Sequence, residues 1–83
     1  MTTDAEIEAA LLARAAARAT SFCPSEVARA LAEDWRPLMP QIRRVAAELQ
    51  TRSALVATQR GTPVVADRAR GPIRLQRPPD PRP

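Results

Sequence analysis

The sequence predicts a single winged helix-turn-helix domain, mainly α-helical, in which three helices precede a two- or three-stranded β wing. Three observations support this prediction. A chain of 83 residues has room for one domain at most. Apolar residues at helical spacing between positions 38 and 49 predict one long, well-formed helix. Two short apolar segments on either side of Gly61 then predict a β-hairpin directly after that helix.

The first helix is predicted over residues 4–18. Acidic residues stand in its first turns, where they interact favourably with the positive end of the helix dipole. A narrow apolar stripe at helical spacing is formed by Ile7, Ala10, Leu11 and Ala15. In the link that follows, Phe22 is expected to enter the core from a brief strand.

The second helix is predicted to begin at Pro24 and to end near Ala32. Proline suits the first turn because the amide that it lacks would have no partner there. The carboxylate of Glu26 can bond back to the free amides of the helix start, and Ser25 is an alternative cap. The buried face is expected to comprise Val27, Ala28 and Leu31.

The third helix has the clearest pattern in the chain and is predicted over residues 40–52. A start at Pro37 keeps Pro40 in the first turn, whereas an earlier start would kink the helix at Pro40. The apolar face comprises Leu38, Ile42, Val45, Ala46 and Leu49. We therefore expect these side chains to turn inward and the guanidinium groups of Arg43 and Arg44 to face the solvent.

The wing is predicted over residues 55–65, with strands at 55–58 and 64–65. Gly61 provides the positive φ that the turn between them needs. Because a lone hairpin is marginal in water, the wing is expected to lie against the helices. Residues 73–75 are expected to be extended and to return one side to the core.

The domain is placed at residues 1–75, and a flexible tail rich in Pro and Arg is placed at residues 76–83. No apolar run approaches the roughly 18 residues of a transmembrane span. The acidic start lacks the basic region of a secretory signal. One cysteine allows no internal disulfide, which predicts a reducing compartment and hence the cytoplasm.

Charge is distributed unevenly along the chain. Residues 1–35 hold three arginines and six acids, a net charge of −3, and residues 36–83 hold ten arginines and three acids, a net charge of +7. All 13 basic residues are arginines, as a GC-rich genome would favour. The asymmetry itself predicts that one face of the molecule meets an anion.

Several strings of the sequence resemble a family of small bacterial proteins. They are CPSEVARAL from Cys23, WRPLMP from Trp35, TQRG from Thr58 and ARGPIRL from Ala69. This family is known only as a domain of unknown function. The resemblance, over about residues 5–75, implies a winged-helix fold and a bacterial origin, and it implies no activity, substrate or catalytic residue.

The residue types argue against an enzyme. The chain has no histidine, so the commonest general base is absent and no Ser–His or Cys–His pair can form. Cys23 stands at a helix start, but a free cysteine is most often a small buried hydrophobic residue. One cysteine and two glycines favour neither a zinc site nor a glycine-rich phosphate loop. We expect no metal, cofactor or small-molecule substrate.

The arginines of the third helix and the wing predict contact with nucleic acid. In a helix-turn-helix, the second helix of the motif enters the major groove and the wing touches the flanking backbone. Those elements are residues 40–52 and 55–65 here. The candidate contact residues for bases and phosphates are Arg36, Gln41, Arg43, Arg44, Arg52, Arg60 and Arg74. Arg68 and Arg70 extend the same track.

Two other interpretations stay open. The arginines could be a solvated face that reflects codon usage alone. The domain could instead be a protein-interaction module, because fold does not determine function and the small residues of the first helix suit close packing against a protein partner or a second copy. Trp35 is expected to anchor the core rather than to stack on a base.

Overall fold

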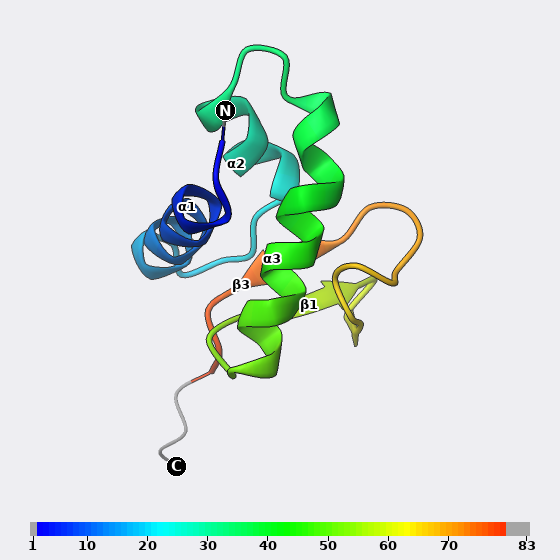
Figure 1. The fold of residues 1–83 in the computed structure, drawn as a ribbon. Helices are drawn as coiled ribbons and strands as arrows, with labels where there is room; N and C mark the ends of the chain where they lie inside the picture. Colours follow the sequence, from blue (N-terminus) through cyan, green and yellow to red (C-terminus); the bar gives the residue numbers. More distant parts are fainter. Residues whose placement is uncertain (1, 80–83) are drawn as a thin grey trace.

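The computed structural model describes residues 2–79 and contains, over that range, three α-helices and a three-stranded antiparallel sheet (Figure 1). The helices are α1 (Asp4–Ala17), α2 (Pro24–Leu31) and α3 (Met39–Thr51), with a 3₁₀ turn η1 (Arg36–Leu38) before α3. The strands are β1 (Val56–Gln59), β2 (Thr62–Pro63) and β3 (Arg74–Gln76). The predicted helices are therefore present within one or two residues of their predicted ends.

The helix starts follow the sequence signals. The Glu26 carboxylate accepts a hydrogen bond from the Cys23 amide at 3.0 Å, as predicted for the start of α2. Thr3 and Glu6 form the same reciprocal arrangement at the start of α1, with both bonds at 3.2 Å. Pro40 lies in the first turn of α3, so of the two starts left open the later one is correct.

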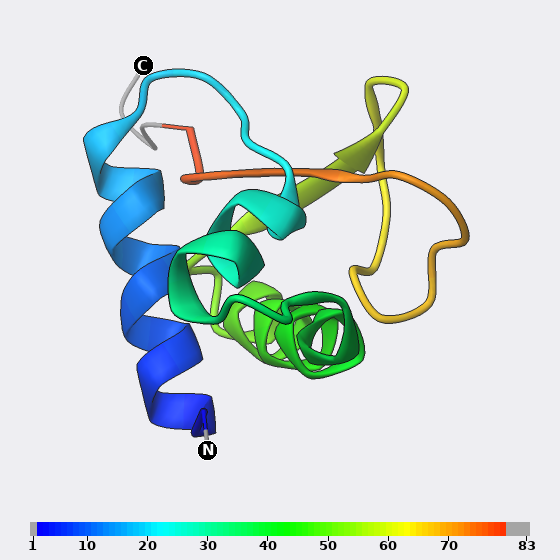
Figure 2. The ribbon, with the colours of Figure 1, turned by 90° about the horizontal axis from the view of Figure 1, so that it is seen from above.

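The sheet is built around β1, which pairs antiparallel with β2 and with β3. Phe22 bridges the other edge of β3, and it exchanges two backbone hydrogen bonds of 2.8 Å with Leu75. Phe22 is therefore in the core as expected, but it forms a single β-bridge and not a strand. α2 and α3 cover one face of the sheet, and the loop between β2 and β3 projects at the end away from α1 (Figure 2).

The second wing strand is predicted at residues 64–65, which is wrong, because β2 occupies Thr62–Pro63. Arg60 and Gly61 both adopt positive φ, of 52° and 82°, and make a two-residue hairpin turn. Such a turn matches the twist of the strands and returns the chain immediately, so pairing resumes at Thr62. Val64 keeps one backbone bond to Ala57 and lies outside the strand.

The core lies where the predicted apolar stripes meet the sheet. Its buried residues are Ile7, Leu11, Ala15, Phe22, Val27, Ala28, Ile42, Val45, Ala46, Leu49, Leu55, Ala57, Ala66, Ile73 and Leu75. Leu31 and Leu38, both predicted to be buried, are only half-buried at the edge of this core. Trp35 also packs against the core while it remains half-buried.

β3 runs to Gln76, the first residue of the predicted tail. Residues 80–83 of the predicted tail lie outside the described residues. Over residues 2–79, none of the helices combines the length and apolar character needed to cross a lipid bilayer.

Candidate nucleic-acid interface

The polar face of α3 carries four of the predicted contact residues, and α1 supplies partners for three of them. Arg44 donates from Nη2 to Asp4 Oδ1 at 2.8 Å. Gln41 donates to the same carboxylate oxygen at 2.8 Å. One turn further along α1, Glu8 forms an ion pair with Arg52, which lies about two turns beyond Arg44 at the C-terminal end of α3. The acidic side of α1 therefore lies along the basic side of α3.

The pair of Arg44 and Asp4 is electrostatically favourable but exposed. The Arg44 hydrogen bond lowers the pKa of Asp4 and, reciprocally, the carboxylate raises the pKa of Arg44. The side chains are 48% and 51% exposed, so water screens the interaction. Arg44 is exposed, as expected, but it is also paired, because α1 packs beside α3 and presents its first-turn acids there.

Arg43, the fourth residue, holds the loop before β3. Its Nη1 donates to the carbonyl of Ala69 at 2.8 Å, and its Nη2 donates to the carbonyl of Gly71 at 2.6 Å. From the opposite strand, the Gln59 amide donates to the carbonyls of Arg70 and Pro72. Four successive carbonyls, residues 69–72, are thus held alternately by two side chains, and we call this stretch the carbonyl segment. Arg43 is expected to face the solvent, but it is half-buried because its guanidinium bonds this loop.

Three arginines of the loop between β1 and β3 are exposed, and within residues 2–79 their side chains make no ion pair or hydrogen bond. They are Arg60 in the hairpin turn, Arg68 in the following turn and Arg70 in the carbonyl segment. We call this set the wing arginines. Only Arg60 is among the main sequence candidates, whereas Arg68 and Arg70 are predicted as an extension of the basic track.

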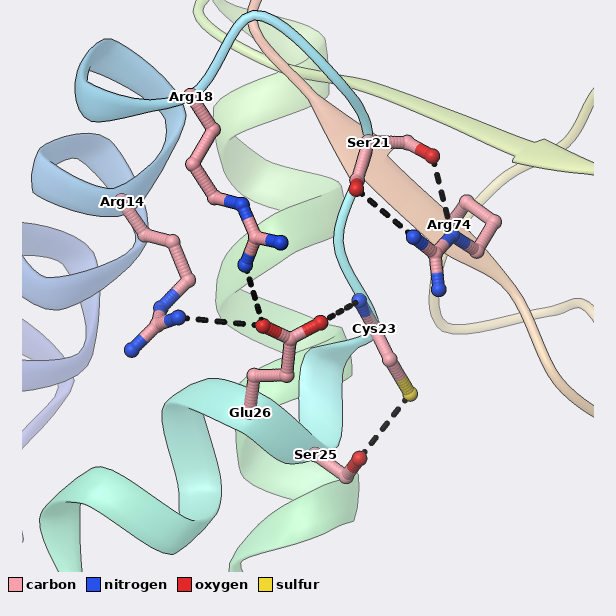
Figure 3. A network of polar contacts seen from close by, with 7 residues as sticks. All are labelled: Arg14, Arg18, Ser21, Cys23, Ser25, Glu26 and Arg74. Atoms are coloured by element: carbon pink, nitrogen blue, oxygen red, sulfur yellow. Dashed lines mark hydrogen bonds and ion pairs between the residues drawn. The ribbon is translucent and has the colours of Figure 1, made fainter.

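Arg74 lies beside the wing arginines and is held in place. Its Nε donates to Ser21 Oγ at 3.0 Å, and its Nη2 donates to the Ser21 carbonyl at 2.8 Å (Figure 3). Within the described residues Nη1 makes no hydrogen bond, so this nitrogen remains available to a ligand. Ser21 itself is not predicted by the sequence, since nothing local links it to a residue 53 positions away.

An open cavity of about 710 Å³ lies between the hairpin turn and the start of β3. It is lined by Gln59, Arg60, Thr62, Val64, Arg70, Gly71, Pro72 and Arg74. Three of these residues are arginines and none carries a carboxylate. The structure therefore brings two sequence candidates, Arg60 and Arg74, together with Arg70 in one basic hollow.

The last sequence candidate, Arg36, lies elsewhere. Its guanidinium stacks over the ring of Trp35 at 4.6 Å from the centroid, and Arg29 lies near the same ring at 4.8 Å. Such contacts stabilise the edge of a small core. Arg36 therefore contributes to the packing around Trp35 rather than to the basic hollow of the wing.

One signal in the sequence does mark the wing. Between Leu49 and Pro79 the chain has six arginines and a single acid, Asp67. Arginines in such a stretch have few acidic residues nearby in the sequence with which they can form ion pairs. The excess of arginines over acids in this stretch therefore favours the wing, and not α3, as the place of unpaired arginines. The acids that pair with α3 come from a distant part of the sequence.

Comparison with known proteins finds one family. The family model described as "Protein of unknown function (DUF3253)" matches residues 4–78, which is nearly the whole described structure. No curated protein matches the chain.

Proposed function

The chain belongs to the DUF3253 family of proteins of unknown function, and we propose that it is a winged-helix module that binds the phosphate backbone of nucleic acid through its wing. The order of the elements supports the winged-helix arrangement. The bridge at Phe22 lies between α1 and α2, and the strand order across the sheet is Phe22, β3, β1, β2. In this arrangement the wing, predicted over residues 55–65, extends through residues 66–73 to the start of β3.

The observation that carries the proposal is that the wing arginines are exposed and that none of them forms an ion pair within the described residues. Arg60 lies in the hairpin turn, and Arg68 and Arg70 lie in the loop after β2; among the described residues none of the three forms an ion pair. Phosphate contacts by arginine supply most of the affinity of non-specific nucleic-acid binding, and they position the protein without reading sequence. A loop with several unpaired guanidinium groups suits this kind of contact.

The role proposed for α3 differs from that of a sequence-reading helix. Arg44 and Arg52 are paired with the acids of α1, and Arg43 is bonded to the carbonyl segment. A base contact by any of them requires that an existing contact be exchanged. We therefore assign the main contact to the wing and a supporting role to α3.

The test measures binding to a fluorescent duplex of about 20 base pairs by anisotropy as a function of salt. Contact with three phosphates predicts a slope of log affinity against log salt of about −2.7. Arg70→Gln is expected to weaken binding and to reduce the slope by about 0.9, the share of one phosphate. The matched control is Arg29→Gln, which removes the same charge from an exposed arginine on α2.

Two results would contradict the proposal. Undetectable binding at about 50 mM salt would exclude a backbone contact of this size. An equal loss of affinity for Arg70→Gln and Arg29→Gln would show that net charge alone drives association.

A second candidate function, a protein-interaction module, is favoured by the outer face of α1. Leu12 is a large apolar side chain that is 37% exposed, and exposed alanines surround it on the helix. Light scattering on the purified chain tests self-association through this face. A dimer that Leu12→Glu converts to a monomer would support this candidate, and a monomer at all concentrations would exclude a homodimer.

A further inference from the structure

We propose that the cavity beside the wing seats one phosphate group, with Arg60, Arg70 and Arg74 as its ligands. The phosphate belongs either to a nucleic-acid strand or to a free phosphate compound. In its nucleic-acid form this site rests on the proposed function, which it deepens by naming where one backbone phosphate sits.

The first argument is charge. Three guanidinium groups line the cavity and no carboxylate lies among the lining residues. Guanidinium presents a planar fork of donors that matches the geometry of phosphate oxygens. A single carboxylate would neutralise one of the three positive charges. A phosphate monoester carries up to two negative charges, and a nucleic-acid strand brings further phosphates beside the first. The surplus charge therefore favours phosphate.

The second argument is that the site is built before a ligand arrives. Ser21 holds Arg74 through Nε and Nη2, which leaves Nη1 as a donor in a fixed position (Figure 3). The wall around Arg70 is held as well, since Gln59 and Arg43 bond the carbonyls of residues 69–72. A ligand that binds here meets one guanidinium, that of Arg74, and a loop backbone at Arg70 whose conformational freedom is already restricted, and this reduces part of the entropic cost of binding.

The third argument is the character and size of the cavity. Its volume of about 710 Å³ lies within the range of small-ligand sites. Besides the arginines, its lining includes Thr62, whose hydroxyl is a further potential donor, and Gln59, whose amide nitrogen is already bonded to the carbonyls of Arg70 and Pro72. The space exceeds a single phosphate group, so it leaves room for the sugar or other group that carries the phosphate.

The test is a titration of the ¹⁵N-labelled chain with inorganic phosphate, followed by proton–nitrogen NMR of the backbone and the arginine Nε–H groups. Saturable shifts are expected at Gly61, Gly71 and Arg74 Nε, and no saturable shift is expected at Arg29 Nε. Arg74→Gln is expected to weaken phosphate binding about tenfold. Because Arg74 also contacts Ser21, Arg60→Gln provides a second variant at an exposed residue without a partner among the described ones.

The variant Ser21→Ala tests the positioning of Arg74 without a change in the charge of the site. It keeps all three guanidinium groups and the bond from Arg74 Nη2 to the carbonyl of residue 21, but it removes the bond from Arg74 Nε to the hydroxyl. Arg74 is then held less firmly, so a weakening of up to about threefold is expected. Unchanged affinity for phosphate in Arg74→Gln and Arg60→Gln would overturn the site. Shifts that rise linearly and equally at all arginines would also overturn it, and so would equal binding of succinate, a dicarboxylate.

A parallel titration with duplex DNA distinguishes this site from the proposed function. Saturable phosphate binding without duplex binding would keep the site and exclude nucleic acid as its source. Duplex binding without a saturable phosphate site would keep the proposed function and overturn this inference. Competition between phosphate and duplex for Arg74 Nε would support both.

Discussion

Glu26 joins α2 to α1 through a single carboxylate. Its Oε2 accepts the Cys23 amide at 3.0 Å, and its Oε1 accepts donors from Arg14 and Arg18 (Figure 3). The pKa of Glu26 lies below its usual 4.5, chiefly because of the Cys23 hydrogen bond and then because of the two arginines, while burial opposes the shift. The ionised form of this residue therefore stabilises the folded chain.

The resulting pH dependence has a definite sign. A carboxyl whose pKa is lowered by folding stabilises the protein above its unfolded value of 4.5, and this contribution is lost as the pH falls through the lowered value. At pH 7 we expect Glu26→Gln to reduce the free energy of unfolding by about 1 kcal/mol. Urea unfolding of both proteins at pH 7 and at about pH 3 measures the difference. A gap that stays the same at both pH values would contradict this role.

Arg43 and Arg44 are sequence neighbours with different expected effects on stability. Arg43→Ala removes two charged hydrogen bonds to the loop, so a loss of about 1–2 kcal/mol is expected in urea unfolding. Arg44→Ala removes an exposed ion pair that water screens, for which a clearly smaller loss is expected. Arg43→Lys should fall between the wild type and Arg43→Ala, since one ammonium group cannot reach two carbonyls as a fork does. Equal losses for Arg43→Ala and Arg44→Ala would contradict the assignment.

At the scale of elements, local patterns predict most of the helices. The spacing of Ile42, Val45 and Leu49 identifies the buried face of α3, and the signal at Pro24 and Glu26 identifies the start of α2. The wing is predicted less well. Its second strand depends on the turn conformation of Arg60, and a positive φ at a non-glycine residue has only a weak sequence signal.

The contacts around α3 could not be predicted, for a different physical reason. Arg44 and Asp4 are 40 positions apart, and Arg43 and Gly71 are 28 apart. Periodicity shows which face of a helix is polar, but it does not show which distant element covers that face. The sequence therefore predicts correctly that these arginines lie outside the core, but it does not identify the distant groups that they contact.

Because β3 pairs with both β1 and Phe22, we expect truncation of its buried residue to reduce the stability of the fold strongly. Leu75 is fully buried in β3 and bonds Phe22 through its backbone. Leu75→Ala is expected to cost about 3 kcal/mol because it leaves a cavity between the sheet and the helices. Thermal or urea unfolding measures this, with Leu12→Ala on the outer face of α1 as a control expected to change stability by less than about 0.5 kcal/mol. Similar losses in both variants would contradict the described core.

At the scale of the whole molecule, the charges are unevenly distributed in space as well as along the chain. The acids of α1 and α2 pair with arginines of α1 and α3 through Glu8, Asp4 and Glu26. The wing arginines lie beyond the reach of these acids in the described structure. Arginines without a carboxylate partner therefore gather in the hairpin turn and in the loop after β2, which Figure 2 shows projecting from the sheet, while Arg29 and Arg36 lie at Trp35.

This arrangement predicts how binding responds to pH. Arginine stays protonated throughout the physiological range and the chain has no histidine. At constant ionic strength, duplex affinity is therefore expected to be flat between about pH 6 and pH 9. Anisotropy titrations in matched buffers measure this. A clear step within that interval would show that a group other than the wing arginines controls association.

The alternation of Arg43 and Gln59 along residues 69–72 also affects how the motion of this loop can be observed. The contacts engage oxygen atoms, while the amides of Arg70 and Gly71 donate to no described residue. Deuterium exchange depends on amide protection, so these two sites are expected to exchange rapidly and to resemble a loose loop. Nitrogen-15 relaxation reports the orientation of the bond itself, and order parameters near the rigid value of about 0.85 are expected at the same amides. Rapid exchange and rigid backbone would then coexist in one short stretch.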